Sequence, residues 1–411
     1  MNVAASARVA PLVALVALLS TACGDSGGGG GGGGGGLTDT VGGTGTPPAC
    51  TLVGDPIPLP YGRDFDVAAL DDASFVLVMS GDDAVTYRVV TASAVSDPDA
   101  VAVGRGAVHL VARAGVVFLE TFPLGWALGP KLATFDGAAW TATTSERVAT
   151  SSSFTSGAAL AASADELAVV WVDGISTTEG YIATWSDAGL SPADPALADV
   201  GDLLGYSVQA AYDLSGRLHV VVVGEVGGSR GLARATRGLD GVWGEATLVG
   251  AAPGALQNII VTGVAADPGG GVWLAEIHGE DFLEDVDGAL TVWRDGGSGA
   301  TVAGTVADER PVVEGLSLAA AGAGRLVLTA SWGENNLEYQ KSDDEVLLYV
   351  CGATGGCRQG AVLDGRKGVF YDGTRVAMGP SGADGLAVWA WQEKGDSDIE
   401  GATAQRFRCS R

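Results

Sequence analysis

A strand-turn-strand unit recurs along most of this chain and limits the folds that the chain can adopt. Each copy joins a run of small or apolar residues, a polar turn and a second apolar run, as in the stretch QAAYDLSGRLHVV at residues 209–221. Short apolar runs broken by Gly, Asp and Ser are typical of strands and tight turns. We identify seven copies, whose second strands begin at Phe75, Val108, Leu167, Leu218, Val272, Leu326 and Leu386.

The spacing of the copies predicts a β-propeller. The intervals between successive second strands are 33, 59, 51, 54, 54 and 60 residues, and all but the first suit one four-stranded blade. Small residues fit the innermost strands, because blades converge on the ring axis. We therefore predict an all-β chain with a single seven-bladed propeller. The short first interval leaves six blades as an alternative. A β-solenoid or a pair of sandwiches is a further alternative, although periods near 54 are long for a solenoid rung.

The amino-terminal residues have the pattern of an export signal. Arg8 follows the amino terminus in a weakly positive region, and Val9 to Leu19 is an apolar run too short to span a bilayer. Ten glycines follow from Gly27 to Gly36. We predict three parts: a signal peptide at 1–22, a flexible Gly-rich linker at 23–49 and a propeller domain at 50–411.

The sequence Ser20-Thr21-Ala22-Cys23 resembles the lipobox of bacterial lipoproteins, with the expected leucine one position early at Leu19. The resemblance implies that Cys23 carries several acyl chains, palmitate among them, which anchor the protein to the membrane of the bacterial cell envelope. The linker would then be a tether with a root-mean-square reach of roughly 28 Å. Both the periplasm and the outer surface remain open as locations. A secreted protein with a spare thiol is the alternative.

The other four cysteines are expected to form two disulfides. Four cysteines allow three pairings. Cys50 lies at the start of the predicted ring and Cys409 near its end, where ring closure brings the segments together, and Cys351 and Cys357 flank a predicted hairpin tip. We favour Cys50–Cys409 and Cys351–Cys357, because the other pairings join both ends of the ring to one hairpin. The chain-entropy model assigns the long loop a stabilisation on the order of 5 kcal/mol.

A second resemblance concerns the predicted ring. The GRLHVV unit at 216–221, with GLARA at 231–235 and Asp240-Gly241-Val242-Trp243, resembles the repeats of sialidase-type, or BNR-like, propellers. The Asp-box of that family is Ser-x-Asp-x-Gly-x-x-Trp. This copy and the DGAAW copy at 136–140 lack its serine and its spacing. The resemblance implies the fold, and it places no arginine cluster or tyrosine–glutamate nucleophile on this sequence.

Acidic residues follow the second strands in six of the seven units, six to eight positions after the first strand residue. Hairpins after the second strands of a propeller emerge on one face of the ring, so this pattern predicts an acidic rim as a candidate binding face. The rim residues are Asp82, Asp173, Glu225, Glu280, Glu334 and Glu393.

Two acidic loops are candidate metal sites. Asp285 and Asp287 alternate in one loop, and Asp396 and Asp398 alternate in the other. Alternating carboxylates supply the oxygen ligands that Ca²⁺ prefers, although neither loop has the full spacing of a calcium-binding loop. Solvated turns in an acidic protein are the alternative interpretation.

Charge excludes one class of partner. The net charge is −26, so a nucleic-acid-binding role is excluded, because phosphate binding needs a basic face. The same charge opposes docking on anionic lipid and favours cations, basic partners or neutral glycans. Hydrophobic residues make up 47% of the chain and charged residues 18%, which indicates a folded body.

Motifs for catalysis are missing from the sequence. It contains no nucleophile elbow, phosphate loop or zinc motif. His109 and His219 each follow the first residue of a predicted second strand, so we expect framework roles for both. We therefore predict a monomeric, non-enzymatic binding or scaffold module whose ligand is a cation, a glycan or an envelope protein. A divergent sialidase-like glycoside-processing enzyme is the main alternative, and a purely structural envelope protein is another.

Overall fold

The computed structural model describes one part of the chain. It covers residues 49–410 except 63, 82, 124–130, 144–154, 174–178, 187–188, 250–257, 280–288, 295–299, 303–310, 323, 335–344, 353–356, 367 and 394–399. The chain divides into two units, Met1–Thr38 and Asp39–Arg411, and all described residues belong to the second. The predicted signal peptide, linker and Cys23 therefore lie outside the described residues and stay predictions.

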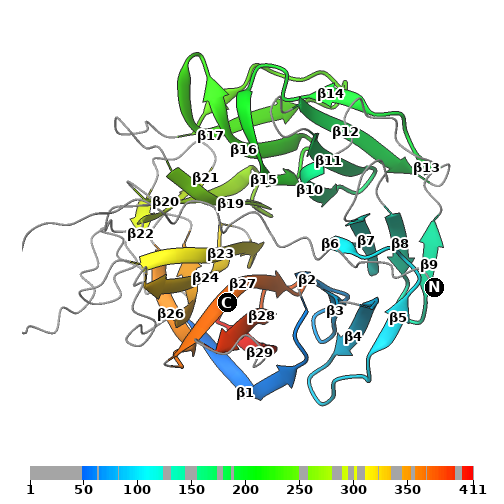
Figure 1. Ribbon diagram of the computed structural model, residues 1–411, viewed down its shortest axis with the longest axis vertical. Coiled ribbons are helices and arrows are strands. Elements are labelled where there is room, and N and C mark those ends of the chain that lie inside the picture. The colour runs from blue at the N-terminus through cyan, green and yellow to red at the C-terminus, as the bar shows by residue number, and fades with distance from the viewer. Residues whose placement is uncertain are drawn as a thin grey trace, which may run out of the picture. The chain divides into compact units, whose positions relative to one another are not determined.

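The described residues form seven antiparallel sheets, which are the blades of a seven-bladed β-propeller (Figure 1). The innermost strands are β2 (Asp64–Ala69), β6 (Gly106–Arg113), β10 (Thr155–Ala162), β15 (Gly201–Tyr212), β19 (Asn258–Ala266), β23 (Pro311–Ala320) and β27 (Val369–Met378). The second strands are β3 (Phe75–Ser80), β7 (Val116–Pro123), β11 (Leu167–Asp173), β16 (Leu218–Val226), β20 (Val272–Gly279), β24 (Leu326–Glu334) and β28 (Asp384–Glu393).

The outer half of each blade completes the sheet. The third strands are β4 (Val85–Val90), β8 (Lys131–Phe135), β12 (Glu179–Ser186), β17 (Ser229–Arg237), β21 (Ala289–Arg294), β25 (Glu345–Cys351) and β29 (Glu400–Cys409). The outer strands are β5 (Asp99–Val101), β9 (Trp140–Thr143), β13 (Gly189–Leu190) with β14 (Asp194–Ala196), β18 (Thr247–Leu248), β22 (Ala300–Val302), β26 (Cys357–Asp364) and β1 (Cys50–Leu59).

Contacts between innermost strands close the ring. Each innermost strand contacts the next along the chain, and β27 of the last blade contacts β2 of the first. The strands come very close together. A Cβ added to Gly315 of β23 would lie 2.7 Å from the backbone nitrogen of Thr374 in β27. Small residues are therefore needed on these strands, as expected from the convergence of blades. The described residues contain no helix, and thus none that is long and apolar enough to cross a membrane.

The core consists of apolar layers between neighbouring blades. The described residues form seven buried clusters, one for each pair of adjacent blades. The second strands are buried on both faces. Phe75 and Leu77 of β3 pack toward the last blade, whereas Val76 and Val78 pack toward the second. Burial on both faces explains why these strands appear in the sequence as continuous apolar runs instead of alternating patterns.

The sequence-based position of the second blade is wrong. Its second strand β7 begins at Val116, and Val108 lies on the innermost strand β6. The intervals on either side become 41 and 51 residues, and the first blade is a complete four-stranded sheet. The cause is the two-residue turn Ala114-Gly115, whose φ angles are 50° and 79°. Two-residue turns of this kind usually have Asn, Asp or Gly at the first position, and Ala114 takes that place here, so the usual sequence signal is missing.

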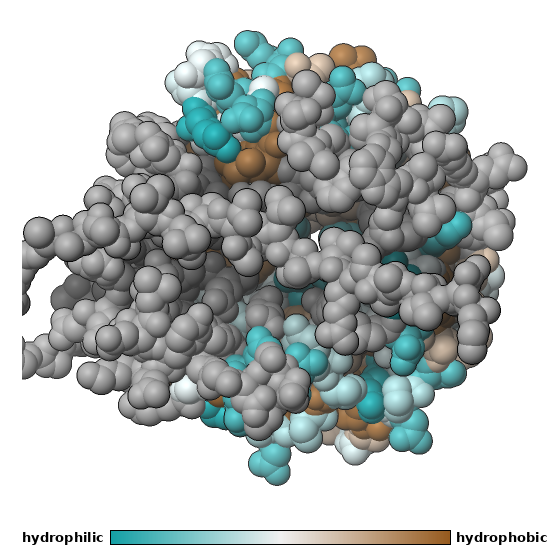
Figure 2. All heavy atoms as spheres, in the orientation of Figure 1, coloured by the Kyte–Doolittle hydropathy of each residue, from teal (hydrophilic) through white to brown (hydrophobic). Residues whose placement is uncertain are grey.

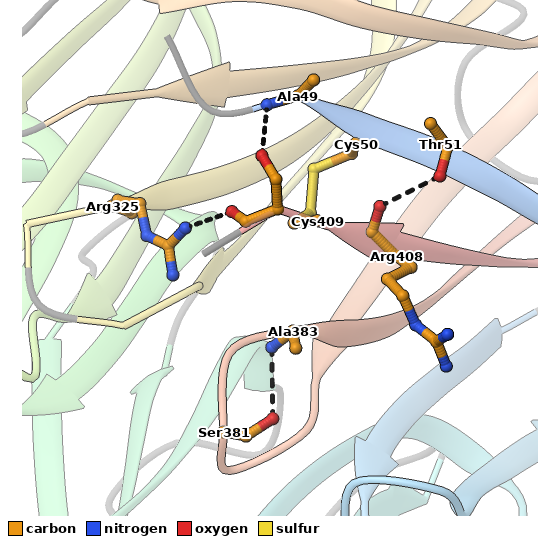
Figure 3. Close-up of a disulfide and its surroundings, with 9 residues drawn as sticks. Ala49, Cys50, Thr51, Arg325, Ser381, Ala383, Arg408 and Cys409 are labelled. Carbon is orange, nitrogen blue, oxygen red and sulfur yellow. Dashed lines mark hydrogen bonds between the residues drawn. A yellow bond between two sulfur atoms is a disulfide. The ribbon is translucent and has the colours of Figure 1, made fainter. Parts of the chain in front are cut away.

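Ring closure joins the two ends of the propeller. β1, the first strand of the chain, is the outer strand of the last blade and pairs with β29, so that Cys50 lies opposite Cys409 (Figure 3). The structure contains the Cys50–Cys409 and Cys351–Cys357 disulfides, the pairing that we favoured. Ala49 and Ser410 add two hydrogen bonds beyond the disulfide, of 3.1 and 2.8 Å. Disulfides form in oxidising compartments, which indicates an exported protein.

The two disulfides are expected to differ in their effect on stability. Replacing both Cys50 and Cys409 by Ser should lower the free energy of unfolding by about 5 kcal/mol, because the closed loop is very long. Replacing both Cys351 and Cys357 by Ser should cost only about 2 kcal/mol, because six residues separate them. Denaturant unfolding of the two double variants measures the difference. Equal losses would contradict the role of ring closure.

Candidate functional site

The two ends of the ring differ in how their polar groups are satisfied. We call the end where the innermost strands begin and the second strands finish the entry end, and the opposite end the turn end. Asp64 pairs with Ser80, and Thr155 with Asp173, at the entry end. Figure 2 shows hydrophilic and hydrophobic residues interspersed on the described surface that it draws, so hydropathy alone marks no site. Buried polar groups are more informative.

At the turn end, aspartate side chains in the tight turns have several hydrogen-bond partners each. Asp213 accepts bonds from the backbone nitrogens of Ser215 and Arg217, and its second oxygen lies 3.1 Å from His219 Nε2. These bonds hold the pKa of the Asp213 carboxyl well below its usual range, although burial opposes the shift. Turns of neighbouring blades also bond to each other, as Asp267 does to the nitrogen of Gly324. The expected framework role of His219 fits this end of the molecule.

Charged residues lie on the innermost strands of three consecutive blades, from Asp64, which begins β2 at the entry end, to Arg375, the seventh of the ten residues of β27. Asp64 and Asp66 lie on β2, His109 on β6 and Arg375 on β27. Asp66 Oδ1 lies 3.8 Å from Arg375 Nε, and Asp66 Oδ2 accepts a 2.7 Å hydrogen bond from the Leu110 nitrogen. The side chains of Arg375 and Asp66 are 35% and 17% exposed, so solvent reaches the pair. We call these four residues the entry cluster.

Burial perturbs the proton affinities of the entry cluster. Desolvation raises the pKa of both Asp64 and Asp66 above the usual value, and the nearby Arg375 guanidinium partly offsets each shift. Burial, with a smaller contribution from Arg375, lowers the pKa of His109 to about 4. At neutral pH the imidazole is therefore uncharged, and the cluster holds one cation, Arg375.

Two polar side chains next to the cluster lack hydrogen-bond partners among the described residues. Glu120 of β7 is fully buried with both carboxylate oxygens unpartnered, and its strand partner is His109, whose Nε2 is also unpartnered. Thr121, the next residue, is fully buried with an unpartnered hydroxyl. Burial raises the pKa of Glu120 well above its ordinary value, so folding favours its neutral form. Such groups usually bond to water, an ion or a ligand.

The framework role predicted for His109 assumed that it holds the same strand position as His219, and that assumption is wrong. His109 lies on the innermost strand β6, whereas His219 lies on the second strand β16, so the two histidines are not equivalent. Sequence reasoning also missed Asp64, Asp66 and Arg375. The available signals were charged residues at alternate positions in β2 and a glutamate inside the apolar run of β7.

The described rim residues lie at the ends of their second strands. Asp173, Glu334 and Glu393 are the last residues of β11, β24 and β28, and Glu225 is next to last in β16. Glu225 and Glu393 are exposed, but Asp173 is only 2% exposed and is not a rim residue. Its burial follows from its place on a strand packed on both faces. Asp82 and Glu280 lie outside the described residues.

The predicted metal ligands cannot be placed. Asp285, Asp287, Asp396 and Asp398 all lie outside the described residues. Within the described ranges, no three His, Cys, Asp or Glu side chains come together in a way that could hold a metal ion.

Glu276 of β20 gives the blade core a predictable dependence on pH. It is 6% exposed, it lies opposite Thr262, and burial raises its pKa from 4.5 to about 7. The protonated form is thus favoured by folding, so its stabilising contribution is complete below pH 4.5 and disappears as the pH rises through 7. The Glu276→Gln variant should therefore exceed the parent in free energy of unfolding by about 3 kcal/mol above pH 7.

Denaturant titrations of both proteins below pH 4.5, near pH 6 and near pH 8 measure this difference. The contributions of other titrating groups to the free energy of unfolding cancel, because only the difference between the two proteins is compared. A constant gap at all three values would contradict a raised pKa at Glu276.

Comparison with known proteins supports the fold. No protein-family model and no curated protein sequence matches this chain. An ulvan lyase from a new family of polysaccharide lyases has a TM-score of 0.53 and 11% identity, over 85% of this chain and 95% of that chain. The polysaccharide lyase Uly1 has a TM-score of 0.51 and 10% identity, over 85% and 90% of the two chains. A fungal lectin from Aleuria aurantia, a six-bladed propeller, has a TM-score of 0.45 and 10% identity, over 75% and 99%. At such identities, the likeness to the two lyases shows a β-propeller fold and nothing more.

Proposed function

We propose that this protein is an exported β-propeller that binds a glycan at the entry end of its ring. The observation that carries the proposal is the half-buried Asp66–Arg375 pair, together with unused hydrogen-bonding capacity on both faces of the second blade. Thr121 lies on the face toward the first blade, and His109 and Glu120 lie on the face toward the third. Sugar hydroxyls both donate and accept hydrogen bonds, so they suit a mixture of carboxylate, imidazole and guanidinium groups. Binding sites commonly combine a few convergent polar groups of perturbed pKa.

The wider setting agrees with this role. Polysaccharide lyases share the fold, and one was solved bound to -[GlcA(1-4)Rha3S]-. The exposed rim residues Glu225 and Glu393 lie at the same end as the entry cluster and would extend the surface around a bound glycan. Calcium bound by Asp285, Asp287, Asp396 and Asp398 is a further part of the proposal.

Loss of Arg375 is expected to weaken glycan binding. A hydrogen bond to a charged group contributes about 1.5–3 kcal/mol, so Arg375→Ala should reduce affinity by about ten- to a hundredfold. The measurement is a glycan array with the full-length chain, followed by calorimetry on the best ligand, with and without calcium. Arg408→Ala is the matched control, because Arg408 pairs with Asp384 at the turn end of the last blade.

Unchanged affinity in a folded Arg375→Ala protein would move the site away from the entry cluster, and no binding to any glycan would refute the proposal. Cleavage of a bound glycan that disappears in Glu120→Gln would instead favour the glycoside-processing alternative, with Glu120 as a proton donor. A proton donor must be protonated before it reacts, and burial favours the protonated form of Glu120.

We also propose that Cys23 anchors the protein to the bacterial cell envelope through lipid. The support is the lipobox-like sequence before Cys23 and the odd number of cysteines, since both disulfides leave only Cys23 unpaired. Intact mass of the membrane fraction should show an acyl-sized increment that is absent in Cys23→Ser. A mature protein of unmodified mass would contradict the anchor and favour a secreted protein.

A further inference from the structure

The balance of charge in the entry cluster indicates which glycans it can accept. Two carboxylates, Asp64 and Asp66, lie beside one guanidinium, Arg375, and His109 is uncharged. Asp66 is already paired with Arg375 and with backbone nitrogens. Asp64 is attracted electrostatically to Arg375 but makes no hydrogen bond or ion pair with any described residue. Among the described residues, the cluster therefore has one carboxylate more than it has guanidinium groups, in a chain of net charge −26.

A second, independent observation lies on the neighbouring blade. Thr121 alternates along β7 with Val117 and Leu119, which pack in the apolar layer between the first two blades. The Thr121 side chain therefore faces the first blade, where its unpartnered and fully buried hydroxyl is an open acceptor. In the same interface, Ser80, the strand partner of Asp64, accepts a 3.4 Å hydrogen bond from the Gly106 nitrogen.

The groups gathered between the first two blades are thus rich in acceptors. Asp64 is acceptor-only when ionised, and the hydroxyls of Thr121 and Ser80 each have acceptor capacity. An ammonium group is the complementary partner, because it has three donors and no acceptor. A sulfate or carboxylate group would instead meet the unpaired Asp64 and the negative field of the whole protein.

We propose that the entry end binds an amino saccharide, with a protonated amine of the sugar paired with Asp64 between the first two blades. This inference rests on the proposed glycan-binding function and narrows it to glycans with free ammonium groups. The anionic -[GlcA(1-4)Rha3S]- chain seen with the ulvan lyase belongs to the opposite class of ligand. A shared fold leaves the charge of the ligand open, because the side chains that set it are independent of the backbone.

The test compares three oligosaccharides of equal length with the full-length chain: an oligomer of glucosamine, its fully N-acetylated form and an oligomer of a uronic acid. Calorimetry should show at least tenfold tighter binding of the amino form than of the N-acetylated form, and none of the uronate. The affinity should fall as salt is added, because salt screens the ion pair. Asp64→Asn should weaken binding of the amino form by about tenfold, toward the N-acetylated level.

Asp99→Asn is the matched control, because it removes the same charge from the exposed outer strand of the same blade and should leave the affinity unchanged. Equal binding of the amino and N-acetylated forms, unaffected by Asp64→Asn, would overturn the ammonium inference while leaving glycan binding intact. Preferred binding of the uronate would also overturn it. Failure of every glycan would refute the proposed function itself. Capture of a lysine-rich peptide instead, with the same dependence on Asp64, would show that the ammonium belongs to a protein and overturn the saccharide assignment.

Discussion

The structure depends on the face-to-face packing of its blades. Every blade lies between two others, so the second strand of each is buried on both sides, and burial of large apolar side chains there contributes roughly 1.5–3 kcal/mol each. Trp171, Trp273, Trp332 and Trp389 are fully buried in these layers. Since such layers exclude water, a charged group within them is destabilising unless it is paired. Glu120, whose two carboxylate oxygens have no hydrogen-bond partner among the described residues, is notable for this reason.

A ring of this kind must also be closed, and the chain uses its first strand to do so. β1 completes the last blade and pairs with β29, so seven sheets are obtained from a linear chain without an unpaired seam. The Cys50–Cys409 disulfide covalently joins the two strands at the edge of the last blade. Opening of the ring would expose both faces of the apolar layer between the last and first blades, to which Leu59 of β1 contributes, so closure and core stability are coupled.

The two ends of the ring have different chemistry. Tight turns at one end satisfy their own polar groups, as around Asp213, and brace neighbouring blades. Further along the innermost strands lie Asp66, His109 and Arg375, with unpartnered polar atoms near them. Buried polar groups without partners lower stability. At His109, Glu120 and Thr121 such groups lie on two paired strands near accessible charges, as we expect where stability is traded for binding.

Much of the architecture was predictable from local patterns. The period of the repeats predicted a propeller, and the positions of Cys50 and Cys409 predicted its closure, because strand runs, turns and cysteines are properties of short segments. The wrong position predicted for the second blade also has a local cause. Ala114-Gly115 turns the chain in two residues, without the polar residues that mark the other hairpins.

The candidate site was decided by the tertiary structure. Asp66, His109 and Arg375 are far apart in the sequence, and only ring closure brings β27 next to β2, whose neighbour on the other side is β6. Asp173 appeared to be a rim acid and is instead buried, because a strand end can still lie between two blades. Local sequence determines which segments become strands and where they turn. Which charges meet, and which lose contact with water, depends on contacts between distant strands that no local pattern encodes.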